Sequence, residues 1–98
     1  MDTSTIIVKN VAPGTLSNAD GVSLKIAIEK TLSDNNIAIL SFAGIDTIST
    51  SFLNSSIGEI VDQFGLQALK NRIKISHYTP SLAAVISKYV GELTASVH

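Results

Sequence analysis

Residues 37–65 decide the fold, and they read IAILSFAGIDTISTSFLNSSIGEIVDQFG. The first six are nearly all apolar and lie between Asn36 and Gly44, which is typical of a strand buried on both faces in a largely parallel sheet. The apolar spacing then changes to that of a helix, which carries on one face Leu53, Ile57, Ile60, Val61 and Phe64. The hydroxyl-rich segment 47–51 therefore lies where a central strand passes into a helix N-terminus, the place where open α/β sheets meet ligands and partners.

Two further strands and a first helix are predicted around this unit. Residues 5–11 are β-branched and apolar enough for a strand, and residues 72–76 alternate as in an edge strand with its charges outward. Ser17 or Asp20 can cap the helix that precedes residue 37. Its apolar face consists of Leu24, Ala27, Ile28, Thr31 and Leu32.

The remaining helix ends have clear signals. Gly65 suits the C-cap of the second helix, residues 66–71 fit either a last helical turn or a loop, and Thr79 with Pro80 starts a third helix. Its apolar face is Leu82, Ile86, Tyr89, Val90 and Leu93. The order β-α-β-α-β-α predicts an α/β fold, in which helices pack on a small, mostly parallel open sheet with residues 37–42 near its centre. We expect one domain over residues 1–98.

Composition excludes several classes of function. The chain has 98 residues, 45% of them hydrophobic and 15% charged, and a net charge of -1, which gives no electrostatic reason to expect nucleic-acid binding. No apolar run is long enough for a membrane span, and the first residues do not resemble a signal peptide. The chain contains no cysteine, so we expect a cytoplasmic protein without disulfides.

The hydroxyl cluster has three interpretations. Six hydroxyl residues fall within ten positions: Thr47, Ser49, Thr50, Ser51, Ser55 and Ser56. One of them can cap the second helix, which needs no more than a single side chain. Alternatively, the cluster is a phosphorylation site, since a helix N-terminus tolerates added negative charge. Capture of a phosphate or another oxyanion by the same helix end is the third possibility.

Phe52 lies roughly 120° from the centre of the predicted apolar face, so it should not share the core of its helix. It either folds over the corner onto neighbouring loops or stands exposed as an aromatic anchor for a partner. Asn54 and Gly58 form a short row of small residues between the predicted apolar face and the solvent face, and Gly58 predicts the close approach of another element, more often the third helix than a second molecule. Phe52, Asn54, Ser55 and Gly58 are the predicted partner-binding residues.

Catalytic and metal-binding patterns are weak. The two histidines, His77 and His98, are separated by the whole third helix, and no His, Asp and Glu set has the spacing of metal ligands. A hydrolytic nucleophile would need a base and an orienting group, and His77 is the one internal base. We therefore expect no catalytic residue, no metal and no cofactor.

The strand-to-helix corner resembles a known family. Residues 48–54, ISTSFLN, continue to Gly58 and follow a turn at residues 42–45, FAGI. This pattern is similar to the STAS-like family of small stand-alone bacterial and phage-borne domains, best over residues 37–65 and more weakly to Val90. The family is related to the STAS domains of anti-sigma-factor antagonists, which are not enzymes and are switched by phosphorylation.

The resemblance implies a function. In the antagonists this corner reads Asp-Ser-x-Gly, and its first Ser is the phosphoacceptor. The acceptor falls on Thr50 here, with Ser49 in the Asp position, Phe52 in the Gly position, and Ser49 and Ser51 as neighbouring candidates. The implied protein is a non-enzymatic regulatory protein-binding module that docks a kinase-like ATPase or an anti-sigma factor through residues 44–58.

The alternative class is a small-ligand, nucleotide or anion-binding domain that uses the same helix N-terminus. A homo-oligomer is compatible with the sequence. Thermal-shift measurements with nucleotides and anions, beside a pull-down from host lysate, would separate the two classes of function.

Overall fold

The computed structural model of the chain describes residues 2–14 and 16–96. In chain order its elements are β1 (Thr3–Ile7), α1 (Val8–Val11), α2 (Asn18–Ser33), β2 (Ile37–Ser41), α3 (Thr50–Leu53), the π-helical turn η1 (Asn54–Gly58), α4 (Glu59–Phe64), α5 (Leu66–Arg72), β3 (Ile73–Ser76) and α6 (Pro80–Ser96). The predicted α/β fold with its alternating strands and helices is confirmed.

The strands form one parallel sheet in the order β1-β2-β3. Ile39 pairs with Thr5 on one side and with Lys74 on the other, so β2 is the central strand and β3 is an edge strand, as predicted. The third strand begins at Ile73, one residue later than predicted, because Arg72 still belongs to α5.

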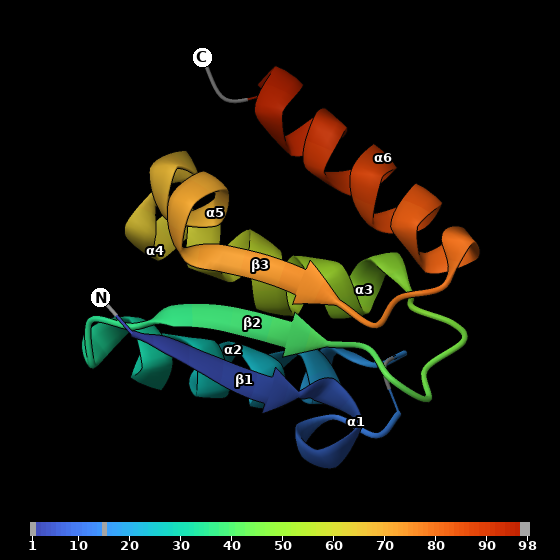
Figure 1. The fold of residues 1–98 in the computed structure, drawn as a ribbon. Coiled ribbons are helices and arrows are strands. Elements are labelled where there is room, and N and C mark those ends of the chain that lie inside the picture. The colour runs from blue at the N-terminus through green and yellow to red at the C-terminus, as the bar shows by residue number, and fades with distance from the viewer. Residues whose placement is uncertain (1, 15, 97–98) are drawn as a thin grey trace.

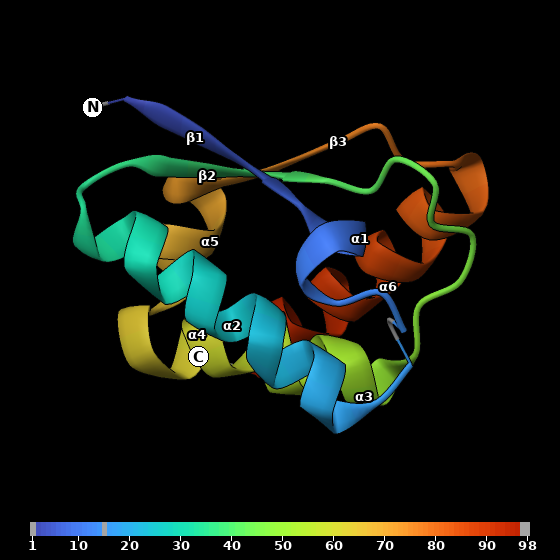
Figure 2. The same ribbon diagram turned by 90° about the horizontal axis from the view of Figure 1, so that it is seen from below.

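The helices cover one face of the sheet and leave the other open (Figure 1, Figure 2). Right-handed crossovers between strands added in the same direction place the connecting helices on one side. On the covered face Ile6, Leu40 and Ile73 are buried, whereas Ile37 and Ile39 on the open face are only half-buried. The prediction that β2 is buried on both faces is therefore wrong for Ile37 and Ile39, and on the open face only Ser41, at the end of the strand, is buried.

The first strand is shorter than predicted. It ends at Ile7, which pairs with Ser41, the last residue of β2, so the chain beyond it has no partner in the ladder. Val8 starts a helical turn instead, and the amide of Ala12 donates to the Val8 carbonyl at 2.8 Å. Both of these side chains are fully buried, which gives the helical turn an apolar anchor that a continued strand would lack.

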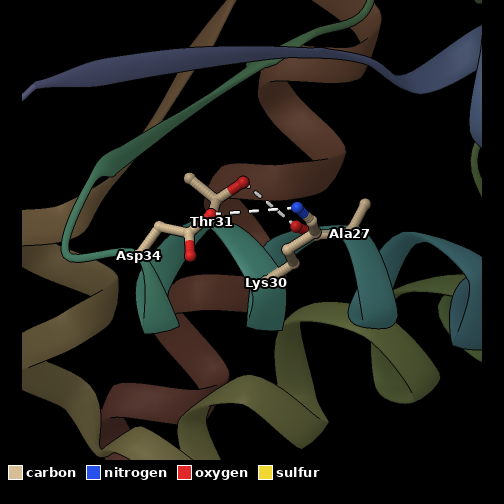
Figure 3. Close-up of polar contacts among 4 residues, drawn as sticks. All are labelled: Ala27, Lys30, Thr31 and Asp34. Carbon is tan, nitrogen blue, oxygen red and sulfur yellow. Dashed lines mark hydrogen bonds and ion pairs between the residues drawn. The ribbon is translucent and has the colours of Figure 1, made fainter.

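Helix α2 begins and ends as its polar residues dictate. Figure 3 shows its last turns, where the Thr31 hydroxyl donates to the Ala27 carbonyl at 3.0 Å, so this buried polar side chain is satisfied. The exposed ion pair between Lys30 and Asp34, at 3.9 Å, adds little stability. Asn35 follows with φ 62, a left-handed conformation that asparagine tolerates and that ends the helix.

The second predicted helix runs from Thr50 to Phe64, but its middle turn is the π-helical η1. Two serines direct their hydroxyls to backbone carbonyls of the preceding turn. Ser56 donates to the Phe52 carbonyl at 2.7 Å, and Ser55 donates to the Ser51 carbonyl at 2.8 Å. Such bonds compete with the amides for carbonyl oxygens and accompany the wider turn.

This turn changes which side chains are buried. Phe52 is fully buried and Phe64 is 39% exposed, so the prediction is wrong for both, whereas Leu53, Ile57 and Ile60 lie in the core as predicted. The buried positions recur every four residues, as Phe52 with Leu53, Ser56 with Ile57, and Ile60 with Val61. The helix packs against α2, and its buried side chains share one core with those of the sheet, so its buried side is wide. Phe64 is the last residue before Gly65, whose φ of 85 redirects the chain.

The later helix ends follow their predicted signals. Gly65 is the C-cap of α4, and the segment left open at residues 66–71 is helical as α5. Helix α6 begins at Pro80, and the Leu82 amide donates to the Thr79 hydroxyl at 3.1 Å. Its predicted apolar face is the one that meets the core, with Leu82 and Ile86 buried and Tyr89, Val90 and Leu93 half-buried.

Candidate functional site

The corner between β2 and α3, residues 42–49, is held from below by apolar side chains. Phe42, Ile45 and Ile48 are all buried, and the Ile45 amide donates to the Phe42 carbonyl at 3.0 Å. Gly44 has φ 78, and a Cβ there would also lie 3.2 Å from the Lys9 side chain. The hydroxyls that follow are therefore presented from a fixed backbone.

Ser49 is the N-cap of α3. Its Oγ accepts a hydrogen bond from the Phe52 amide at 3.0 Å and donates one to the Leu16 carbonyl at 2.7 Å. The first contact satisfies a free helix amide, and the second ties the helix start to the loop before α2. The hydroxyl of Ser49 is thus engaged in structure, which leaves its neighbours as the accessible candidates.

Thr50 and Ser51 are the first residues of α3, and both side chains are exposed. Neither hydroxyl makes a hydrogen bond within the described part of the chain. They lie at the N-terminal end of the continuous helical segment 50–64, where the backbone dipole favours negative charge. Of the three predicted phosphoacceptors, these two are open to a modifying enzyme.

Thr50 stands at the rim of two adjoining hollows between α3 and α6, with volumes of about 340 and about 320 Å³. We call them together the α3–α6 groove, which is lined by Ile48, Thr50, Leu53, Asn54, Val85, Lys88, Tyr89, Glu92 and Leu93. The groove combines apolar side chains with charges of both signs, Lys88 and Glu92, as a protein-docking surface does.

Tyr89 connects the two walls of the groove. Its hydroxyl donates to Asn54 Oδ1 at 2.8 Å, and a Cβ on Gly58 would lie only 2.6 Å from that hydroxyl. The prediction that Gly58 admits the third helix is confirmed. Burial, followed by the negative charges of Asp62 and Glu59, raises the pKa of Tyr89, so the phenol stays protonated and able to donate.

The four predicted partner-binding residues lie in different surroundings. Phe52 is inside the core and offers no surface to a partner, and Gly58 lies half-buried beneath Tyr89. Ser55 is half-buried against α2, where a Cβ on Gly21 would collide with its hydroxyl. Asn54 is exposed and lines the groove.

The opposite wall of the groove was missed from the sequence. Val85, Lys88 and Glu92 come from α6, and they recur at the spacing of a single helix face. Val85 is an apolar residue outside the predicted apolar face, which was the signal available in the sequence, and the structure leaves it 40% exposed.

His77 lies at the end of β3, is exposed, and places its Nδ1 3.1 Å from the Ser76 hydroxyl. The other histidine of the sequence, His98, is outside the described residues. Residues 2–14 and 16–96 contain no group of three or more His, Asp or Glu side chains arranged to hold a metal ion. Over the same residues no helix combines the length and apolar character that crossing a bilayer requires.

A three-stranded parallel sheet with helices on one face and accessible hydroxyls at the corner after its central strand defines a small open-sheet α/β domain. The chain belongs to the family of STAS-like domains of unknown function, whose model matches residues 20–83. That match includes most of α2, all of β2, the corner and β3, and it confirms the predicted family. Neither the curated proteins nor the solved structures contain a significant match.

Proposed function

We propose that this chain is a regulatory protein-binding module that docks a partner through residues 44–58 and the facing side of α6. The proposal rests on the different surroundings of the three hydroxyls at the corner. Ser49 caps the helix, while the hydroxyls of Thr50 and Ser51 are exposed and unengaged within the described residues. Capping alone needs one hydroxyl, so it leaves the exposed pair unexplained.

Phosphorylation of Thr50 would act on the groove without disturbing the fold. A phosphate adds about -1.5 to -2 charges, which the start of α3 tolerates. Lys88 and Glu92 contribute one charge of each sign to the same groove, so the added charge makes it clearly negative. A partner fitted to the unmodified groove would then meet electrostatic repulsion, whereas a partner with basic side chains would be favoured.

The class of partner follows from the resemblance of the corner to the anti-sigma-factor antagonists. We propose a kinase-like ATPase or an anti-sigma factor. Such a partner could both bind this surface and, in the case of a kinase, modify Thr50. We further propose that the domain has no turnover of its own, and a hydrolase screen in which activity is lost in His77→Ala would refute that part.

The test compares pull-downs from host lysate with the wild-type chain, Thr50→Glu and Thr50→Ala. We expect Thr50→Glu to lose the partner or exchange it, and Thr50→Ala to bind under all growth conditions. Both variants should melt within a few degrees of the wild type, because Thr50 is exposed. Ser23→Glu is the matched control, since it adds the same charge at an exposed hydroxyl of α2, outside the groove.

Intact-protein mass spectrometry of material from the native host measures the modification directly. If no phosphate is found under any growth condition and Thr50→Glu binds like the wild type, the switch is refuted. Thermal-shift measurements with nucleotides and anions test the alternative class. A saturable rise in melting temperature that Thr50→Glu abolishes would indicate an anion site at this helix end instead of a protein-docking surface.

A further inference from the structure

A separate apolar cleft of about 210 Å³ lies between α5, β3 and α6. Helix α6 lies beyond β3 at the edge of the sheet (Figure 1). The walls are aliphatic, with Ile57 and Ile86 at the buried end and Leu69, Ile75 and Val90 only half-buried. The core is therefore open to solvent at this place, and an apolar occupant would remove that surface from water.

The size and lining of the cleft narrow the class of occupant. An apolar cavity of about 150 Å³ is enough to hold a benzene molecule, so this cleft can take a hydrocarbon chain of several carbons. Among the described residues no aromatic side chain lines it, so they offer no stacking surface to a nucleobase. These two features favour a short aliphatic chain.

The charge at the cleft indicates which polar group the other end of the ligand carries. Within residues 2–14 and 16–96, Lys70 and Thr94 are its polar lining residues, and no acidic side chain lines it. Lys70 makes no ion pair within the described part of the chain. The Nζ of Lys74 donates to the Lys70 carbonyl at 3.4 Å, and Lys74 does not line the cleft.

The third cation of this region is directed elsewhere. Arg72 Nη2 donates to the Leu32 carbonyl at 2.8 Å and to the Asn36 carbonyl at 3.2 Å, so it holds the end of α2. Lys70 is thus the cation available to a ligand in the cleft. We infer that the cleft binds a medium-chain aliphatic carboxylate, with its tail among the aliphatic side chains and its carboxylate beside Lys70. The cleft shares no lining residue with the α3–α6 groove, and this proposal does not rest on the function proposed for that groove.

The test uses octanoate as the probe in a titration of the 98-residue chain followed by ¹H–¹⁵N NMR. We expect saturable shifts at the amides of Leu69, Ile75 and Val90. Hexanoate should bind about tenfold more weakly because it buries two fewer methylene groups. Lys70→Gln should weaken octanoate binding about two- to fivefold and leave 1-octanol unaffected, whereas Lys88→Gln, on the other side of α6, should change neither.

A second pair of variants tests the location. Val90→Phe should fill the cleft and abolish binding, whereas Val85→Phe makes the same change in the α3–α6 groove and should leave binding intact. Equal effects of the two variants, or shifts confined to the open face of the sheet, would overturn the proposal. It would also be overturned if the wild-type chain were a dimer that Val90→Phe dissociates, because a second copy would then occupy the cleft.

Discussion

Replacing Phe52 by alanine should remove a large part of the stability of this domain. The ring is fully buried in the core, and its helix packs against α2. A buried Phe→Ala change costs about 3 to 5 kcal/mol of the free energy of unfolding. A domain of this size has about 5 to 15 kcal/mol in total, so the melting temperature should fall by about 15 °C or more.

Phe64→Ala is the matched control. It makes the same change later in the same helix, at a side chain that is 39% exposed. Because the ring is only partly removed from water and its loss leaves no enclosed cavity, we expect a cost of about 1 to 2 kcal/mol. Urea denaturation followed by circular dichroism gives both values, with unchanged m-values as the check on two-state behaviour. If Phe64→Ala costs as much as Phe52→Ala, the buried face follows the regular helix period and the π-helical explanation is refuted.

Three further predictions concern the packing and capping of the helices. Gly21→Ala should destabilise the domain by about 1 to 3 kcal/mol, because the new Cβ would lie 2.7 Å from the Phe52 carbonyl oxygen. Gly91→Ala is its control and should stabilise α6 by about 0.5 to 1 kcal/mol, because a Cβ there has no neighbour within 4 Å. Equal effects of the two variants in thermal melts would contradict the close contact between α2 and α3 at Gly21. Ser49→Ala should cost about 1 to 2 kcal/mol through its lost bonds to Phe52 and to the loop, and a cost near zero in urea denaturation would show that Ser49 is not the cap. The pKa of Tyr89 is raised on folding, so its contribution to the free energy of unfolding is present below about pH 10 and is lost as the pH rises through its folded pKa. Tyr89→Phe should flatten that loss of stability, and a variant whose stability depends on pH as the wild type's does would contradict this role of Tyr89.

Helix starts were predictable because capping is local chemistry. Ser17, Ser49 and Thr79 each accept a hydrogen bond from an amide three residues later, and in each case the hydroxyl residue comes directly before its helix begins. The same holds for Gly65, whose positive φ costs glycine little. Such signals depend on only a few consecutive residues, so they do not depend on how distant segments of the chain pack.

Burial on each face was harder to predict because it depends on distant segments. The apolar run of β2 suits a strand covered on both sides, yet the crossovers place the helices on one side, and this leaves Ile37 and Ile39 half-exposed. The interchange of Phe52 and Phe64 has a similar origin. A fixed helical period cannot show that Asn54–Gly58 winds as a π-helix, or that α2 covers a second side of that helix.

The candidate site was predictable in position but not in composition. A hydroxyl cluster at a strand-to-helix corner indicated the place, but sequence alone could not show which hydroxyl is the cap. The hydrogen bonds of Ser49 identify it as the cap, and they leave Thr50 and Ser51 as the accessible pair. The facing wall comes from α6, where Tyr89 reaches Asn54 from 35 residues away, a separation over which no local pattern carries information.

Helix α6 joins the two proposed sites, because neighbouring stripes of one helix line both. Val85 and Lys88 face the α3–α6 groove, and Ile86 and Val90 face the aliphatic cleft. A rigid helix cannot shift to accommodate an occupant on one side without changing the space on the other, and so binding at the two sites should be coupled. Thermodynamic linkage requires that coupling to be reciprocal. Octanoate should therefore change the affinity of the chain for the proposed protein partner, and in Val90→Phe octanoate should leave that affinity constant. If octanoate also leaves the affinity unchanged in the wild type, α6 is fixed and the two sites are not coupled.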